Sequence, residues 1–285
     1  MTCITLSCCV RPATVCRIEA FIDSRGIFAV PENISTLARQ GYDRWDLGSH
    51  FGIGEEDADY KALRAAYDDL PEDPYATGSG RYRRYARGVF LPWSKEFFWM
   101  PATESQARDG MNGYYQGDNN PEYVNVTRDL PAISDEVCNN KLLLDMIQFD
   151  FSQTHWNEDD SVWPLYVGVH LIKLHIAEDG YEAVSSPNEL HQDGEPYVFA
   201  HMIYRHNAEG GANLIATPDY RGKQPEDVPP ADRLAEFQME RPLEAYAITD
   251  DLVSHYVGPI RKGSAPEPGE RAILLADWVP MRHRI

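Results

Sequence analysis

The chain has 285 residues, a length that suits one large domain with a substantial hydrophobic core. Hydrophobic residues make up 43% and charged residues 25%, which is typical of globular proteins and excludes disorder over most of the chain. The sequence has 26 Lys and Arg against 45 Asp and Glu, giving a net charge of −19. Such acidity disfavours binding to nucleic acids and to anionic membranes, because those surfaces are also negative.

The N-terminal region gives few structural signals. The segment from Met1 to Cys16 lacks the charged start and long apolar stretch of a signal peptide, and no transmembrane helix is predicted. Four of the five cysteines lie in this segment without a Cys-x-x-Cys pair, so we expect reduced thiols, no structural zinc and a cytoplasmic location. We expect residues 1–60 to be an extension and cap, and residues 61–285 to form a single domain.

Two helices are predicted before the main run of strands. The segment from Asp57 to Leu70 has apolar residues at helical spacing and ends at Pro71. The segment from Ser134 to Phe151 begins with a capping serine and two acidic residues, which favour a helix N-terminus. Between these helices, Arg81 to Phe90 is typical of a strand, and the Gly-, Asn- and Asp-rich stretch 109–122 is typical of a loop.

The second half of the sequence has the patterns of β-strands. Pro164 to Ile176 is apolar at both alternating sets of positions, which indicates a strand buried on both faces. Turn signals such as Gly210-Gly211 and Asp250-Asp251 separate the other candidates. These further strands are expected at 197–204, 213–217, 243–249, 254–260 and 271–279. Helices followed by strands predict an α+β domain whose second half is a sandwich or barrel.

A candidate metal site lies in the β-rich half. His191 and Asp193 are two residues apart on an extended segment, so their side chains point to the same side and could share one ion. His255, at the start of a later strand, is the best-placed third ligand, and two His with one carboxylate is the ligand set of non-haem Fe(II) oxygenases. The alternative for His191 is a loop histidine hydrogen-bonded to its own Asp193. The alternative for His255 is a half-buried strand histidine.

Arg271 adds to this hypothesis. It opens the last predicted strand, sixteen residues after His255, and adjacent antiparallel strands are expected to bring the two residues together. A buried guanidinium binds a carboxylate bidentately, which a dicarboxylate cosubstrate requires. The alternative is a surface arginine paired with Glu270 or Asp277.

These residues resemble a known family. The motif His191-Gln192-Asp193-Gly194 is followed by a strand that ends in Arg205-His206-Asn207-Ala208-Glu209-Gly210-Gly211. Later come His255, within the segment 254–260, and an arginine that opens the final strand. Together with landmarks such as Leu70-Pro71, this pattern is similar to the 2-oxoglutarate/Fe(II)-dependent dioxygenase family of the bacterial L-isoleucine 4-hydroxylase type, over roughly residues 70–279.

The resemblance implies a double-stranded β-helix, a jelly-roll or cupin-like barrel, with helical cover. It implies Fe(II) bound by His191, Asp193 and His255, and 2-oxoglutarate with its far carboxylate on Arg271. With O2 as the other cosubstrate, the implied reaction hydroxylates an unactivated side-chain carbon of a small free amino acid and releases succinate and CO2. The same iron chemistry could instead desaturate or cyclise an amino-acid-derived metabolite in biosynthesis.

Several residues are candidates for binding the substrate. Guanidinium groups suit the carboxylate of an amino acid, with surface salt bridges as the alternative role for each arginine. Arg81 and Arg83 alternate along the predicted strand, so both face one side and Tyr82 faces the other. The candidates are Arg81, Arg83, Tyr115, Gln116 and Arg205.

Other function classes fit the sequence less well. A cupin-type enzyme without a cosubstrate usually carries His-x-His and a later Glu, whereas position 193 is Asp. A non-catalytic cupin-like binding protein would be marked by a lost ligand, yet all three ligands are present. A zinc hydrolase is disfavoured because the sequence contains no His-Glu-x-x-His.

Overall fold

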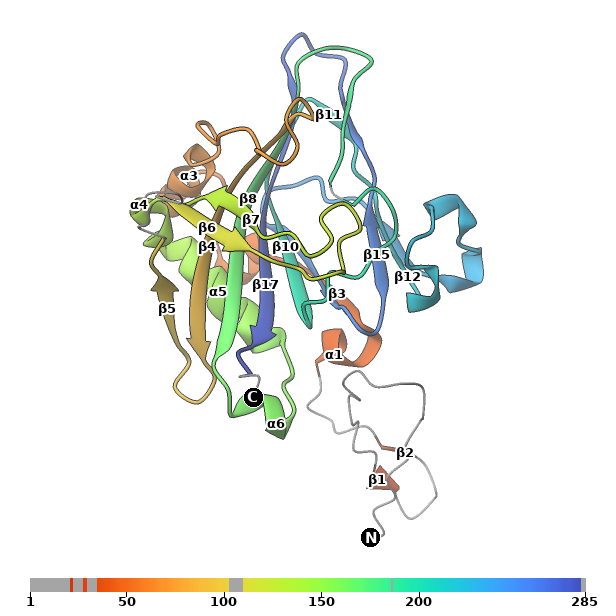
Figure 1. The fold of residues 1–285 in the computed structure, drawn as a ribbon. Helices are drawn as coiled ribbons and strands as arrows, with labels where there is room; N and C mark the ends of the chain where they lie inside the picture. Colours follow the sequence, from red (N-terminus) through yellow and green to blue (C-terminus); the bar gives the residue numbers. More distant parts are fainter. Residues whose placement is uncertain (1–20, 23–27, 30–34, 103–109, 186, 283–285) are drawn as a thin grey trace.

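A seven-stranded antiparallel sheet forms the centre of the molecule (Figure 1). The structure is a computed structural model that describes residues 21–22, 28–29, 35–102, 110–185 and 187–282. The four N-terminal cysteines lie outside these ranges. In spatial order, the strands are β3 (Tyr42–Asp46), β14 (Glu244–Thr249), β10 (Tyr197–His206), β17 (Gly269–Pro280), β8 (Leu165–Ile176), β4 (Arg81–Leu91) and β5 (Glu96–Met100).

Smaller sheets accompany the large one. One three-stranded sheet comprises β13 (Arg233–Phe237), β12 (Asn213–Ala216) and β15 (Ser254–Val257), and another comprises β11 (Ala208–Gly210), β16 (Ile260–Lys262) and β9 (Glu182–Ala183). The remaining pairs are β6 (Met111–Tyr114) with β7 (Arg128–Pro131), and β1 (Phe21–Ile22) with β2 (Phe28–Ala29). The large and small sheets together form the predicted double-stranded β-helix, or jelly roll.

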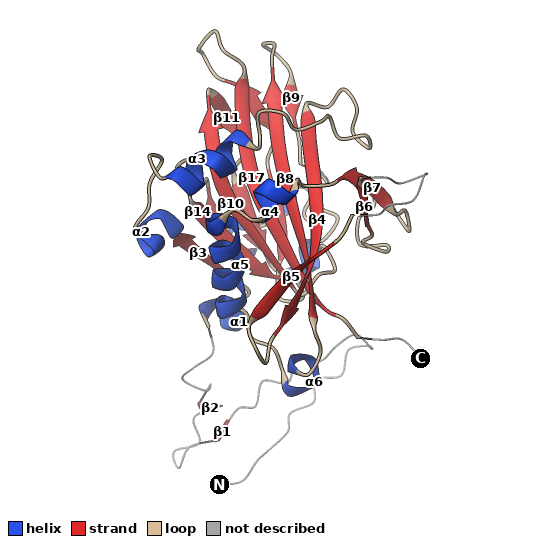
Figure 2. Cartoon of the chain, turned by 90° about the vertical axis from the view of Figure 1, so that its left-hand side faces the viewer, coloured by secondary structure: helices blue, strands red, loops and turns tan. Residues whose placement is uncertain are grey.

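Helices cover one face of the large sheet (Figure 2). The helices are α1 (Thr36–Gln40), α2 (Leu47–Phe51), α3 (Ala58–Ala65), α4 (Asp135–Cys138), α5 (Lys141–Gln153) and α6 (Glu158–Ser161), with short 3-10 turns at Pro218–Tyr220, Pro225–Asp227 and Pro230–Asp232. Buried side chains of α3 and α5 pack against the sheet to form the largest hydrophobic core. Within the described ranges, none of the helices is long and apolar enough to cross a membrane.

Strand β17 shows how the sheet separates core from cavity. Ala272, Leu274, Ala276 and Trp278 alternate along it and pack into the helix-covered core. Because successive side chains point to opposite faces, the intervening residues face the other way. Those residues are Arg271, Ile273, Leu275 and Asp277, and all four line a cavity. One face therefore supports the fold, and the other carries the charged groups.

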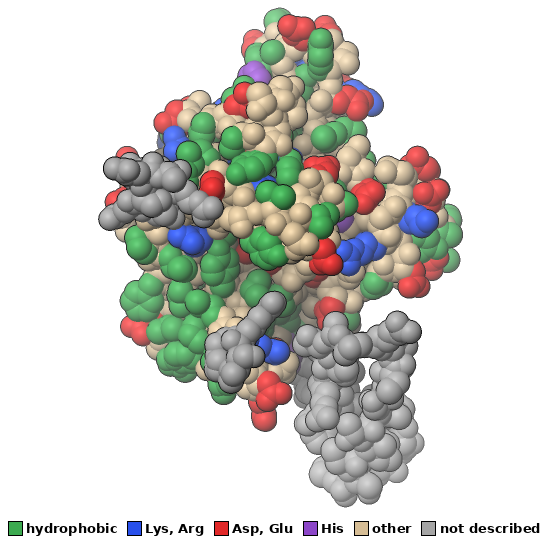
Figure 3. Space-filling model, in the orientation of Figure 1, with side chains coloured by type: hydrophobic (Ala, Val, Ile, Leu, Met, Phe, Trp, Pro, Cys, Tyr) green, Lys and Arg blue, Asp and Glu red, His purple; other side chains and the backbone are tan. Residues whose placement is uncertain are grey.

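The β4–β5 hairpin illustrates the same alternation at the edge. Phe97 and Trp99 pack against the core, whereas Phe98 is 53% exposed. Trp93, in the turn, is 60% exposed, and hydrophobic side chains gather over this hairpin in Figure 3. The hairpin therefore contributes only one of its faces to the core.

The predicted elements agree with the structure at most positions, with four corrections. The single strand predicted at 254–260 is two strands, β15 and β16, which belong to different sheets. The first helix ends at Ala65 rather than Leu70, and turns connect it to Pro71. The second predicted helix is two helices, α4 and α5, because the side chain of Asn140 accepts a hydrogen bond from Leu143 N and starts a new N-terminus. The predicted loop 109–122 contains β6, which pairs with β7.

Residues before position 60 contribute to the large sheet. Strand β3 forms its edge by pairing with β14, and α1 and α2 lie on either side of β3 in the sequence. From residue 35 onward, this segment therefore contains both helices and a strand of the large sheet. The division of the chain at residue 60 stays a prediction.

Candidate metal centre and its cavity

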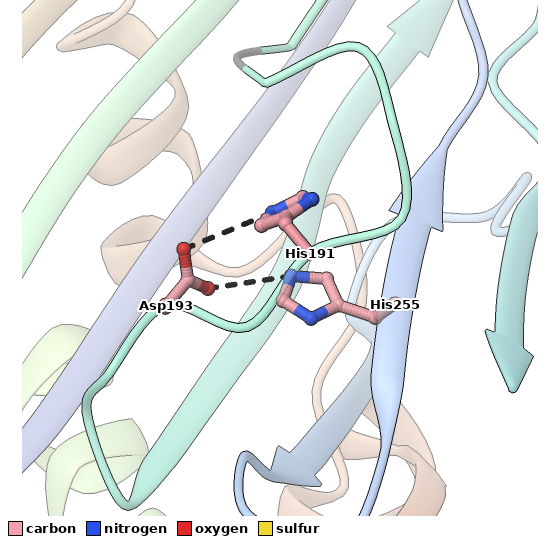
Figure 4. Close-up of side chains that lie close together, drawn as sticks. All are labelled: His191, Asp193 and His255. Atoms are coloured by element: carbon pink, nitrogen blue, oxygen red, sulfur yellow. Dashed lines mark ion pairs between the residues drawn. The ribbon is translucent and has the colours of Figure 1, made fainter. Parts of the chain in front are cut away.

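Three candidate ligands converge from two segments of the chain (Figure 4). His191 and Asp193 lie between β9 and β10, and His255 belongs to β15. The backbones of His191 and His255 form an antiparallel bridge, with N–H···O distances of 2.9 Å and 3.0 Å. This bridge places the two imidazole ring centroids 4.1 Å apart, so main-chain pairing positions both rings.

The geometry of the donor atoms fits one metal ion. Asp193 Oδ1 lies 3.7 Å from His191 Nε2, and Asp193 Oδ2 lies 3.3 Å from His255 Nε2. The three donors all lie within 4.8 Å of one another. His191 Nδ1 is 2.8 Å from the carbonyl oxygen of Glu189, which orients its Nε2 toward the other donors. Two histidines and one carboxylate match the ligand set of non-haem Fe(II).

The electrostatics of the site also suit a cation. Burial lowers the pKa of His191 to about 4, and the neighbouring His255 adds to this effect, so this imidazole is neutral and able to bind a metal. Burial alone would raise the pKa of Asp193, but His255 and its hydrogen bond hold it well below its usual value. Asp193 is therefore ionised. Metal binding would displace the proton that His255 shares with it.

Asp250 holds the segment that carries Asp193. Its two carboxylate oxygens accept hydrogen bonds from the backbone N–H groups of Asp193 and Gly194, each at 2.8 Å. Gly194 has a φ of +84°, and a Cβ there would lie 2.0 Å from the side chain of Asn119, so glycine is required. In the sequence, Asp250 is predicted only as part of a turn. Its position directly after a predicted strand gives no sign of this contact with Asp193.

The three candidate metal ligands line one cavity between the large sheet and a smaller one. Residues of the large sheet form one side, and His255 and Val257 of β15 line it from the smaller sheet. Apolar side chains make up much of the wall. They are Ile172, Val198, Ala200, Ile248, Val257, Ile273 and Leu275.

Arg271 lines the same cavity and is only 2% exposed. Within the described residues it forms no ion pair, and its Nε has no hydrogen-bond partner. Burial lowers the pKa of Arg271 to about 10, and nearby Tyr246 partly opposes this effect. A buried cation of this kind needs an anionic partner, and the far carboxylate of 2-oxoglutarate would supply one.

The structure corrects the expected path by which Arg271 reaches the site. The strand of Arg271 was expected beside that of His255, but β17 pairs with β10 and β8, whereas β15 pairs with β12. Arg271 and His255 therefore lie in different sheets and meet across the cavity. Only the three-dimensional closure of the two layers brings them together.

Three of the five predicted substrate residues line the cavity. Arg81 and Arg83 both face it, as the alternation along β4 predicted, and Gln116 donates from Nε2 to Asp193 Oδ1 at 3.3 Å. Tyr115 is 56% exposed and bonds to Asn125 outside the cavity lining. Arg205 donates to the carbonyl oxygens of Ala208 and Gly210, so the structure does not bring it to the cavity.

The cavity contains a second cluster of polar side chains, which was not predicted from the sequence. It surrounds Tyr114, whose hydroxyl lies 3.3 Å from Glu195 Oε1, and Arg128 lies over the same ring at 4.7 Å. Burial raises the pKa of Glu195 well above its usual value, and Asp277 adds to the effect. Arg128 and Tyr114 come from short strands beside a loop, and Glu195 comes from a connecting segment. None of these positions carries a periodic signal.

Two histidines, an aspartate and a buried arginine in a partly apolar cavity define a mononuclear non-haem iron oxygenase. The model of the 2OG-Fe dioxygenase family matches residues 64–277, and the chain belongs to this family. Members use Fe(II), 2-oxoglutarate and O2, which confirms the cofactors expected from the sequence. The predicted resemblance is likewise confirmed.

Relatives of known sequence or structure agree with this assignment. The chain is 28% identical over 181 residues to the 3(1)-hydroxy-L-isoleucine 4-dioxygenase of Pantoea ananatis, covering 59% of this chain and 67% of that protein. IDO from Bacillus thuringiensis has a TM-score of 0.64 at 22% identity, covering 86% of this chain and 92% of that chain. A BsmA homologue from Methylobium petroleophilum has a TM-score of 0.65 at 17% identity, covering 87% and 92% respectively. These structures support the jelly-roll fold.

Proposed function

We propose that this dioxygenase hydroxylates an unactivated side-chain carbon of a small free amino acid and releases succinate and CO2. The observation that carries the substrate class is the combination of basic and acidic side chains in one partly apolar cavity. Arg83 and Arg128 line it together with Glu195 and Asp277, beside the metal ligands. A zwitterion with an aliphatic side chain complements such a surface. The similarity to an enzyme named for a hydroxy-isoleucine substrate supports the same class.

The residues of the chain divide the work of this reaction. His191, Asp193 and His255 would hold Fe(II) through three donors and leave its remaining positions to ligands in the cavity. Iron, when bound, supplies the power to activate O2 and oxidise a C–H bond. Arg271 would orient 2-oxoglutarate by a bidentate contact to its far carboxylate. Apolar side chains such as Ile273 and Leu275 exclude water from the reacting groups.

The candidate substrate residues differ in how free they are to act. Arg81 Nε donates to Asp73 Oδ2 at 2.8 Å, and both residues are buried, so its charge is already balanced. Arg83 donates from Nη2 to His170 Nδ1 at 2.7 Å, while its buried Nε has no partner among the described residues. Gln116 bridges Asp193 and Arg128. Arg83 and Gln116 are therefore better placed than Arg81 to form a contact with a substrate.

A panel of free amino acids tests this proposal. Purified protein with Fe(II), 2-oxoglutarate and O2 should release succinate at a rate that at least one aliphatic amino acid increases severalfold. Mass spectrometry should then find the amino acid with one added oxygen. Loss of two hydrogens instead would indicate desaturation or cyclisation at the same site. If every amino acid leaves succinate at background while a peptide or a terpenoid stimulates it, the proposed substrate class is wrong.

A further inference from the structure

The cavity contains four buried arginines. Arg271 is assigned to the cosubstrate, and two of the other three have partners that account for their charge. Arg81 is paired with Asp73. Arg83 donates to His170 Nδ1, and the other nitrogen of this ring, Nε2, lies 3.0 Å from Asp277 Oδ2. Because Nδ1 accepts from a guanidinium, Nε2 must carry the ring proton and donate to Asp277. A neutral imidazole thus links the Arg83 cation to the Asp277 anion.

Arg128 has no such balance. It is 3% exposed, and its partners are the rings of Tyr114 and Tyr123, at 4.7 Å and 4.5 Å, and Gln116 Oε1, at 2.5 Å. No carboxylate in the described part of the chain forms an ion pair with it. Aromatic faces and an amide soften the cost of burying a guanidinium but do not neutralise it. The cavity therefore presents a cation that lacks an anion.

Glu195 is the matching acidic group, and an ammonium beside it would stabilise its ionised form. It is 6% exposed, and its Oε1 accepts a hydrogen bond from the Tyr114 hydroxyl. Its Oε2 is buried and has no hydrogen-bond partner among the described residues. In the described part of the chain, Glu195 and Arg128 form no ion pair with each other, although both contact Tyr114. The carboxyl group of Glu195 thus lies at the hydroxyl of Tyr114, and the guanidinium of Arg128 lies over the ring of the same tyrosine.

We propose that Arg128 binds the α-carboxylate and Glu195 the α-ammonium of the amino-acid substrate, with Tyr114 as the spacer that keeps them apart. This inference rests on the proposed function and names its specificity-determining residues. An α-amino acid carries its two charges on neighbouring atoms, so it would complete both unpaired groups at once. Its polar head would lie next to Gln116, which contacts Asp193 directly, and its aliphatic side chain would extend along the apolar wall.

The position of Gln116 makes the subsite continuous with the metal centre. Its Nε2 donates to Asp193 Oδ1 at 3.3 Å, and its Oε1 accepts from Arg128 Nη2. Arg271 lies six residues from Asp277 along β17, which corresponds to about 20 Å of strand. Asp277 pairs with His170, whose ring centroid lies 4.7 Å from that of Tyr114, so the proposed head-group site lies at the Asp277 end. The cosubstrate cation and the substrate head group therefore occupy separate ends of the cavity, as simultaneous binding requires.

Ligands that lack one charge distinguish the two roles. The probes are L-isoleucine, 3-methylpentanoate, which lacks the ammonium, and 2-methylbutylamine, which lacks the carboxylate. Their dissociation constants are measured by calorimetry on the anaerobic Fe(II) and 2-oxoglutarate complex, so that binding is observed without turnover. Glu195→Gln should weaken L-isoleucine about tenfold or more and leave 3-methylpentanoate unchanged. Arg128→Gln should weaken both acids and leave the amine unchanged.

Controls separate recognition from a structural effect. Arg128→Lys keeps the charge and should retain part of the affinity, whereas Arg84→Gln, on β4, should change none of the three constants because Arg84 is bonded to the Ala132 carbonyl oxygen. A variant that weakens all three ligands equally would indicate damage to the cavity and would overturn the assignment. So would unchanged constants in both variants, or a wild type that binds 3-methylpentanoate as tightly as L-isoleucine.

The two proposals can fail separately. If free amino acids stimulate succinate release but Arg128 and Glu195 variants bind them normally, only this subsite is wrong. If no free amino acid stimulates succinate release, the proposed function is wrong, whatever the binding constants show.

Discussion

The two faces of the large sheet each bury a histidine–carboxylate pair, and the pairs differ in what surrounds them. On the helix-covered face, His201 Nε2 lies 3.1 Å from Asp150 Oδ2 of α5, and both residues are completely buried. On the cavity face, His170 Nε2 lies 3.0 Å from Asp277 Oδ2, but His170 also accepts from Arg83. The first pair connects a helix to the sheet, and the second connects charged groups that line the cavity. Location, rather than residue type, decides whether such a pair supports the fold or the chemistry.

The largest expected effect concerns the metal ligands on the cavity face. His255→Ala should reduce succinate release to background, because two remaining donors cannot hold the ion in place. The rate is measured on metal-replete protein. His175→Ala is the matched control, since His175 is 28% exposed and pairs with Glu270 away from the cavity lining. Turnover near the wild-type rate in His255→Ala would remove His255 from the ligand set.

The next effect concerns the core pair. Asp150→Ala should lower the free energy of unfolding by about 3 kcal/mol, because it leaves His201 unpaired in an apolar environment. Urea unfolding measures this change. Binding of Fe(II) and 2-oxoglutarate to the folded variant should match the wild type. An unchanged unfolding midpoint would show that the pair does not stabilise the fold. Weakened iron binding would show that the two faces are not functionally separate.

The cosubstrate contact should have an effect of one to two orders of magnitude. Arg271→Leu should raise the concentration of 2-oxoglutarate needed for half-maximal turnover about tenfold or more, since a charge-assisted contact contributes roughly 1.5–3 kcal/mol. Arg261→Leu is the control, because Arg261 is an exposed residue paired with Glu182. An unchanged requirement in Arg271→Leu would show that Arg271 does not bind the far carboxylate of 2-oxoglutarate.

The smallest effect concerns a third pair, which is half-buried. Burial alone would raise the pKa of Glu270, but hydrogen bonds from His175 and Tyr204 hold it below its usual value. A lowered carboxyl pKa stabilises the fold above the unfolded-state pKa, and this contribution is lost as pH falls through the folded-state pKa. Glu270→Gln should therefore lower the free energy of unfolding at pH 7 by less than about 1 kcal/mol and reduce its decrease toward pH 4, as measured by urea unfolding at each pH. An identical pH profile in both proteins would exclude this contribution.

Local patterns in the sequence predicted a sandwich or barrel in the second half of the chain, and the family resemblance specified the jelly roll. The two-sided alternation of β8 and the spacing of His191 and Asp193 are properties of neighbouring residues, so they survive any tertiary arrangement. His255 and Arg271 were predicted from their positions at the start of later strands. Their meeting across two sheets depends on pairing between distant strands, which no local pattern specifies.

The missed residues share a physical reason. Arg128 and Tyr114 lie on four-residue strands, too short for alternation to be recognised, and Glu195 and Asp250 lie just outside strands. Each acquires its role from contacts with residues far away in the sequence, such as Tyr114 with Glu195. The split between α4 and α5 was not predicted, because the apolar pattern continues across Asn140 and only its side-chain cap marks the new N-terminus.

Anaerobic titration of Fe(II) into wild-type protein, Asp193→Ala and Asp150→Ala tests the central claim most directly, because it asks which carboxylate belongs to the metal site. We predict one Fe(II) bound per chain in the wild type and in Asp150→Ala, and none in Asp193→Ala. Equal stoichiometry and affinity in Asp193→Ala and the wild type would contradict the assignment of the metal centre to the cavity face.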